Sequence, residues 1–199
     1  TLEKLLGINM IMEKPNISKS TKLLIQNYNE IEKAEDLAIK DSKKIISFLI
    51  GDIKKELEEK SFKLEIDPMT NNRVFKKNKW ELKENNKKII FGFSIELGDT
   101  QKILPKNRIF IGLRVTAREQ GYAKIQKKIN KNIVEILSNE VKKLYKIKDG
   151  NAWWVFIINI PEFKGDWEEW VDNTKNEFNK MVETVEPILD KNIAHIINI

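Results

Sequence analysis

Two segments of the sequence alternate between large apolar residues and smaller or polar ones, and this alternation constrains the fold most. Residues 89–97 read IIFGFSIEL and residues 109–116 read IFIGLRVT. Because successive side chains of a strand point to opposite faces, each segment places its large apolar side chains on one face. We expect two antiparallel neighbours with that face in a core. Its side chains are Phe91, Phe93, Ile95 and Leu97, then Ile109, Ile111, Leu113 and Val115.

Shorter segments extend this sheet. In residues 62–66, the apolar Phe62, Leu64 and Ile66 alternate with charged residues, and the turn-forming DPMTNN follows. A further strand is predicted through Arg73 to Phe75 or Lys79 to Leu82, and AWWVFIINI, residues 152–160, predicts a late strand. The predicted sheet is therefore an antiparallel meander of about five strands.

Helical spacing dominates elsewhere. It predicts helices from Thr21 to about Lys40, from an N-cap at Asp41 and Ser42 to Leu57, and from Ala123 to Ile147. In the third helix, Ile125, Ile129, Ile133, Ile136, Leu137 and Leu144 fall on one arc. The pattern predicts an α+β fold with an N-terminal helical segment, residues 1–40, and an α+β domain, residues 41–199.

A long final helix is predicted from an N-cap at Asp166, with Pro187 expected to kink or interrupt it near its end. Its apolar stripe steps alternately by four and three residues, which would suit the core or a partner helix. The stripe consists of Trp167, Val171, Thr174, Phe178, Met181, Val185 and Ile188.

Composition excludes several classes of protein. The 199 residues include no cysteine, which excludes disulfides and cysteine zinc sites and agrees with a cytoplasmic location. No apolar run approaches the roughly 18 residues that span a membrane, so we expect no membrane partner. Residues 61–150 carry 21 Lys and Arg against 10 Asp and Glu, whereas residues 151–199 carry 4 against 9. A basic middle beside an acidic end predicts either a polyanionic partner or mutual attraction of the two segments.

Lysines gather on one side of the third predicted helix. Such a face can neutralise phosphates without reading base sequence, although lysine on a surface helix is also an ordinary solvated residue. The candidate nucleic-acid-binding residues are Lys124, Lys127, Lys128, Lys131, Lys142 and Lys146.

Four of the five tryptophans lie between Trp153 and Trp170. In a strand Trp153 and Trp154 would point to opposite faces, whereas Trp167 and Trp170 would share the sheet-facing side of a helix. We therefore expect core packing for Trp154, Trp167 and Trp170, and only Trp153 is a candidate for stacking on a ligand.

A small charged patch is expected on the two central strands. Glu96 and Arg114 fall on matching faces near Gly92 and Gly112, with Trp153 close by. The patch predicts either a ligand cleft or a salt bridge between the strands.

A trace of a metal-dependent nuclease motif is also present. Asp67 followed by Glu81 and Lys83 has the order of a PD-(D/E)XK site, in which carboxylates hold Mg²⁺ and lysine stabilises charge. The polar surround of Glu81 equally suits an edge strand. No other metal or cofactor is expected, and His195, the only histidine, has no evident partner.

From about Asp41 onward, the order of features resembles the C-terminal region of prokaryotic PD-(D/E)XK nuclease-like proteins. The segments that carry the resemblance are KKIIFGFSIEL, RIFIGLRV, NAWWVFI, PEFKGDWEEW and the long closing helix. In those proteins the catalytic residues lie in a separate upstream domain, so the resemblance implies a non-catalytic portion of a phage-defence or mobile-element protein.

Three functions therefore remain open. The first is a nucleic-acid-associated accessory or recognition domain, which could have an upstream nuclease domain as its partner. The second is a protein-interaction module that uses the C-terminal helix, and the third is a standalone Mg²⁺-dependent nuclease.

Overall fold

The computed structural model describes residues 18–66, 72–84, 87–97, 109–117, 123–148, 153–160 and 165–198. Contacts divide the chain into two units, Thr1–Ala38 and Ile39–Ile199. The loop with Pro105 and the acidic Asp67 lie outside the described residues.

The first unit is helical where it is described. Helix α2, Lys19–Gln26, is capped by Ser18, and helix α3, Tyr28–Glu59, contributes residues to both units. The predicted break at Asp41 and Ser42 is wrong, because Asp41 pairs with Lys44 inside the helix at 2.8 Å. The break falls instead at Asn27, whose side chain and backbone N–H groups both donate to Leu23 O.

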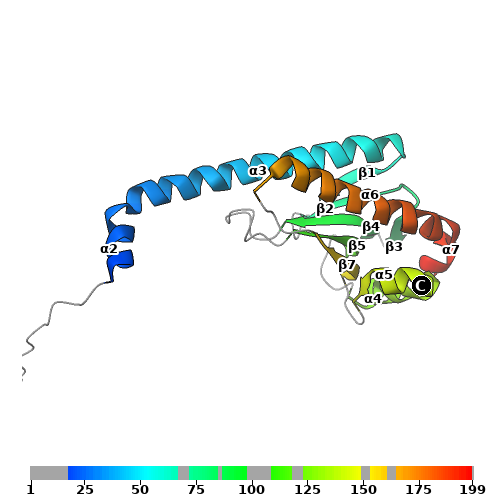
Figure 1. Cartoon of the computed structure of the whole chain (residues 1–199). Coiled ribbons are helices and arrows are strands. Elements are labelled where there is room, and N and C mark those ends of the chain that lie inside the picture. Colours follow the sequence, from blue (N-terminus) through cyan, green and yellow to red (C-terminus); the bar gives the residue numbers. More distant parts are fainter. Residues whose placement is uncertain are drawn as a thin grey trace, which may run out of the picture. The chain divides into compact units, whose positions relative to one another are not determined.

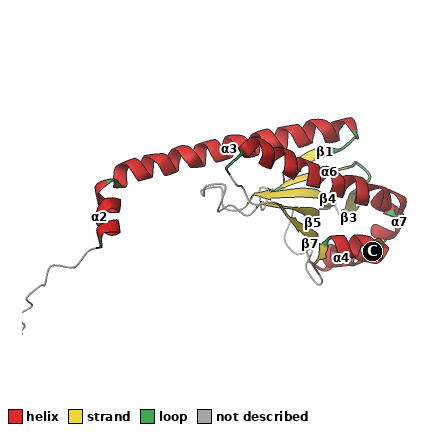
Figure 2. Cartoon of the chain, in the orientation of Figure 1, coloured by secondary structure: helices red, strands yellow, loops and turns green. Residues whose placement is uncertain are grey.

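The second unit contains an antiparallel sheet of seven strands (Figures 1 and 2). Its order is β1-β2-β4-β5-β7-β6, with β3 paired to β4. Both alternative segments between Arg73 and Leu82 form strands, and β4 and β5 are the predicted antiparallel neighbours. The strands are β1 Lys63–Ile66, β2 Arg73–Lys76, β3 Glu81–Glu84, β4 Lys87–Leu97, β5 Ile109–Ala117, β6 Lys146–Ile147 and β7 Trp154–Asn159.

Helices cover one face of this sheet. The residues of α3 that belong to the second unit and helix α6, Trp167–Lys191, lie over that face (Figure 1). The ring of Phe178 on α6 packs 5.7 Å from Phe75 and 6.4 Å from Phe93, between ring centroids. The predicted alternation of β4 and β5 is confirmed, since Phe93 pairs with Leu113 and both are fully buried in this core.

The third predicted helix is divided in the structure. Helix α4, Ala123–Ile136, ends before Ser138, which caps the short helix α5, Asn139–Leu144, by accepting from the Val141 N–H group. Residues 146–147 then form β6 rather than a last helical turn. Leu144, expected on the apolar arc, is consequently exposed.

The final helix begins as predicted, because the Asp166 side chain accepts from the N–H groups of Glu168 and Glu169. It is not interrupted at Pro187 but continues to Lys191, and helix α7, Ile193–Ile196, follows. The centre of its stripe, from Val171 to Val185, is buried in the chain's own core. None of the described helices is long and apolar enough to cross a membrane.

The opposite face of the sheet is shaped by two glycines. A Cβ atom at Gly92 would lie 2.4 Å from Phe75 O, and one at Gly112 would lie 2.2 Å from Phe156 O. The backbone of a neighbouring strand therefore occupies the place where a side chain would stand.

Candidate nucleic-acid interface

Helix α4 separates apolar and amide residues from lysines. Ile129 and Ile133 are fully buried, and Lys124, Lys127 and Lys128 on the other side are exposed. Positions three, four and seven apart share one face of a helix, so Lys131 joins this exposed row.

Two asparagines fix the orientation of α4. Asn130 donates from Nδ2 to the carbonyl of Trp154 at 2.9 Å, which ties the helix to β7. Asn132 donates from Nδ2 to the carbonyls of His195, Ile196 and Asn198 at 3.1 to 3.3 Å. Asn130 thus binds β7 and Asn132 binds the C-terminal end of α7, so the lysine face is held outward by contacts to both elements.

The lysines continue beyond α4. We call the eight lysines from Lys124 to Lys148 the basic surface; the same stretch, residues 123–148, contains only two acids, Glu135 and Glu140. Within the described part of the chain, the basic surface has one ion pair, between Lys131 and Glu135 at 3.7 Å. Its members are Lys124, Lys127, Lys128, Lys131, Lys142, Lys143, Lys146 and Lys148.

A hollow opens beside the C-terminal end of the basic surface. Its volume is about 320 Å³, and its lining combines two lysines with apolar side chains. Such a site offers lysine ammonium groups to an anion and an apolar wall to an aromatic ring. The lining residues are Phe110, Leu144, Lys146, Lys148, Ile157 and Ile158.

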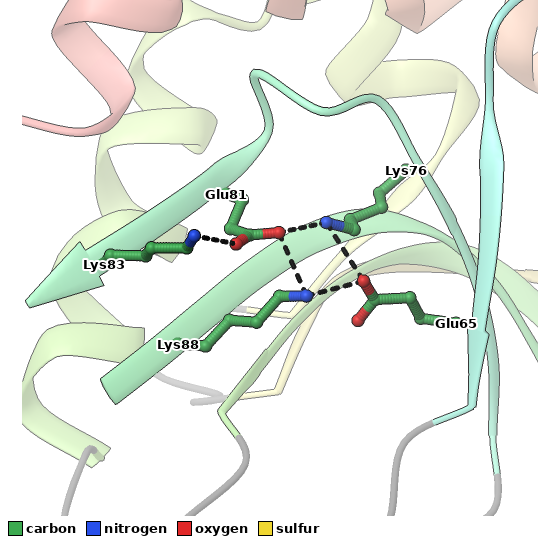
Figure 3. A network of polar contacts seen from close by, with 5 residues as sticks. All are labelled: Glu65, Lys76, Glu81, Lys83 and Lys88. Atoms are coloured by element: carbon green, nitrogen blue, oxygen red, sulfur yellow. Dashed lines mark hydrogen bonds and ion pairs between the residues drawn. The ribbon is translucent and has the colours of Figure 1, made fainter. Parts of the chain in front are cut away.

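The lysines of the sheet have very different surroundings (Figure 3). Lys76, whose side chain is 3% exposed, lies 3.1 Å from Glu65 and also binds Glu81. Lys88 lies 2.6 Å from Glu65 and 3.0 Å from Glu81. We call these four residues the ionic cluster; it joins β1, β2, β3 and β4 and carries no net charge.

The ionic cluster alters the titration of its carboxyl groups. Burial raises the pKa of Glu81, but hydrogen bonds from Lys76 and Lys88 outweigh burial and lower that pKa to about 2. The pKa of Glu65 is lowered against the same opposing effect of burial. Both carboxylates therefore stay ionised, with their oxygens directed at ammonium groups.

This geometry bears on the nuclease motif. Asp67 lies outside the described residues, and Glu81 faces two lysine ammonium groups. Lys83 is mostly exposed and lies 3.7 Å from Glu81. The structure thus places Glu81 and Lys83 together on β3, in an ion-pair network that joins this strand to β2 and β4.

A second group of lysines binds α6. Lys77 pairs with Glu186 and lies 2.7 Å from Asp190, and Lys79 lies 3.1 Å from Asp190. The indole N–H of fully buried Trp80 donates to the same Asp190 carboxylate at 2.7 Å. These lysines neutralise part of the acidic C-terminal region, as the mutual-attraction alternative predicts.

The structure brings Glu96, Arg114 and Trp153 together. Arg114 Nη1 lies 3.4 Å from Glu96 Oε2, and the guanidinium carbon lies 5.4 Å from the Trp153 ring and 5.1 Å from the Trp154 ring. Arg114 is almost fully buried, and a side chain at Gly92 or Gly112 beside it would collide with a backbone oxygen of a neighbouring strand. The residues form a salt bridge flanked by two aromatic rings.

Two tryptophan predictions were wrong. Trp153 precedes β7, which starts at Trp154, and the register shifts between Leu113 and Arg114. Strand alternation therefore does not separate the two rings, and both contact Arg114. Trp167 is 39% exposed and packs edge-on against Phe48, whereas Trp170 is buried as expected.

Sequence reasoning also missed partners. His195, for which no partner was expected, has Nε2 3.5 Å from Glu135 of α4. Lys143 and Lys148 were not among the predicted binding residues but belong to the basic surface. Lys76 could have been found, because it follows Val74 by two residues and so shares a face with that buried side chain.

No family model, curated protein or solved structure matches this chain. The resemblance to PD-(D/E)XK nuclease-like proteins therefore remains an expectation from the sequence segments alone.

Proposed function

We propose that this chain is a nucleic-acid-associated accessory or recognition domain that contacts phosphates through its basic surface. One observation carries the proposal. Among the lysines of residues 76–88, Lys76, Lys77 and Lys88 each contact two carboxylates. Most lysines of the basic surface, by contrast, have no carboxylate within 4 Å among the described residues. Ammonium groups of the second kind are available to replace the counterions of a polyanion.

The proposal includes the setting that the resemblance implies. The domain would act in the cytoplasm beside an upstream nuclease domain of a prokaryotic defence or mobile-element protein, without catalysing cleavage itself. Phosphate contacts supply affinity and orientation but little sequence preference, which suits an accessory role.

Salt dependence tests the proposal directly. Fluorescence anisotropy with labelled duplex DNA should show binding whose affinity falls steeply with salt, with a log–log slope of about −0.9 for each neutralised phosphate. A variant with Lys124, Lys127, Lys128 and Lys131 changed to Gln should bind more weakly and show a shallower slope. The proposal fails if the folded protein shows no binding at low salt.

A matched variant separates a defined surface from net charge. Lys54 and Lys55 lie on α3, Lys60 follows its end and Lys180 lies on α6, and changing all four to Gln removes the same charge. We expect this variant to bind like the unmodified protein. Equal weakening by both variants would show that only overall charge matters.

The other two functions find less support. The C-terminal stripe that would serve a partner helix is mostly buried in the chain's own core. A nuclease centred on Glu81 requires DNA cleavage with Mg²⁺ or Mn²⁺ that Glu81→Gln abolishes; we expect intact DNA with both proteins.

A further inference from the structure

Large apolar side chains are exposed in two places that the proposed function does not use. Eight of the ten large hydrophobic residues that are exposed in the described chain lie on α2, on α3 or at the start of α6. Exposed large apolar side chains that gather in one part of a chain can mark an interaction site.

The first place belongs to the N-terminal unit, and we call it the N-terminal apolar face. No residue of α2 is buried, and none of α3 before Ser42 is buried. Tyr28 is 60% exposed. The face consists of Leu23, Leu24, Ile25, Tyr28, Ile31 and Leu37.

The second place belongs to the other unit, and we call it the aromatic groove. It has a volume of about 480 Å³ and is lined by Ile45, Phe48 and Trp167, with the Asp41–Lys44 ion pair at its edge. Phe48 is 51% exposed although its ring contacts Trp167 at 6.0 Å between centroids. The groove is therefore preformed and partly open.

The charges around the two places are complementary. Residues 28–37 carry four acids and one lysine, whereas residues 40–44, beside the groove, carry three lysines and one aspartate. Helix α2 carries Lys19 and Lys22 with no acid, whereas the start of α6 carries Asp166, Glu168 and Glu169. Each charged segment beside the apolar face thus has a counterpart of opposite sign beside the groove.

We propose that the N-terminal apolar face of one chain docks into the aromatic groove of a second copy of this chain. Each copy supplies one surface of each kind, so a twofold dimer would satisfy both surfaces of each copy. Opposite charges meet when residues 28–37 of one copy lie along residues 40–44 of the other. Apolar side chains are buried where the N-terminal apolar face meets the aromatic groove, and the opposite charges favour this pairing of surfaces over others.

Mass measurement gives the first test. Light scattering of the full chain over a dilution series should give twice the 23.4 kDa monomer mass at high concentration. Ile31→Asp and Phe48→Asp, one on each surface, should each yield monomers with unchanged circular dichroism. Leu144→Asp, at a more exposed apolar residue on α5, should remain dimeric. A monomeric wild-type protein, or dimers that survive both variants, would overturn the proposal.

Pairing of the two surfaces can be tested covalently, because the chain has no cysteine of its own. A Tyr28→Cys chain mixed with a tagged Phe48→Cys chain should form a mixed disulfide dimer under mild oxidation, in preference to either homodimer. Charge reversal adds a rescue. Glu32→Lys with Glu35→Lys should weaken dimerisation roughly tenfold, and adding Lys40→Glu and Lys43→Glu should restore it. Random cross-linking or absence of rescue would exclude this pairing.

Discussion

The ionic cluster and the basic surface are both rich in lysine, but they differ in what surrounds each ammonium group. In the cluster, Lys76 and Lys88 each contact two carboxylates and are largely withdrawn from water. On α4, Lys124 and Lys128 are exposed and extend into solvent. Charge counted along a sequence is therefore a poor measure of the charge available to a partner. The same residue type holds strands together in one place, and in the other it is exposed with few carboxylates nearby among the described residues.

The largest expected difference in stability between the two regions concerns Lys76 of the ionic cluster. Changing it to Gln leaves the partly buried Glu65 and Glu81 to share Lys88, with the exposed Lys83 also near Glu81. The free energy of unfolding should therefore fall by about 2–3 kcal/mol, less than for a fully buried pair. Lys128→Gln on the basic surface should change stability by less than about 0.5 kcal/mol. Urea unfolding measures both, and equal effects would remove the distinction.

Acid should weaken the cluster in a defined range. The pKa of Glu81 is about 2 in the folded chain and 4.5 as the ordinary value, so its contribution is present above the higher value and lost as pH falls through the lower one. We expect a loss of about 2 kcal/mol between about pH 5 and pH 2, allowing for solvent screening. Glu81→Gln should reduce this pH dependence in urea titrations. A variant with the wild-type acid profile would contradict the assignment.

The anchoring of the basic surface gives a smaller effect. Asn132→Ala removes an amide that donates to carbonyls at the end of α7, and should destabilise the chain by about 1–2 kcal/mol. Lysine number is unchanged, so the salt slope of DNA binding should stay the same while thermal stability falls. Asn139→Ala, at an exposed asparagine of α5, provides the control.

The smallest effect should come from Glu135. Its carboxylate lies 3.7 Å from Lys131 and 3.5 Å from His195, both at the surface. Glu135→Gln should alter stability by less than about 0.5 kcal/mol, and should strengthen DNA binding about twofold by releasing Lys131. Anisotropy at low salt would detect the change; weaker binding would mean that Glu135 orients the lysine.

The sheet was predictable because alternation is a local signal. The pairing of β4 with β5, their buried face and the Asp166 cap all followed from spacing within a few residues. The helix boundaries near Asp41 and Ser138 were wrong, since residues that favour caps can also lie within a helix or start a new one when tertiary contacts decide.

The partners of charged residues could not be predicted in the same way. Lys76 meets Glu65 and Glu81 across three strands, and Asn132 meets residues more than sixty positions away. The row of lysines on α4 was visible from helical spacing, but the lack of a carboxylate near most of them within the described chain depends on the packing of distant segments. Exposure of Trp167 similarly depends on where α3 packs against α6.

Gly92 and Gly112 have a consequence for recognising relatives of this chain. Even alanine at either position would collide with a main-chain oxygen, so neither site can drift by neutral substitution unless the adjoining strand moves with it. Two glycines twenty residues apart, each between large apolar residues of paired strands, should persist after most surface residues have diverged. A search that weights these positions above the lysines should reach homologues that overall similarity does not detect.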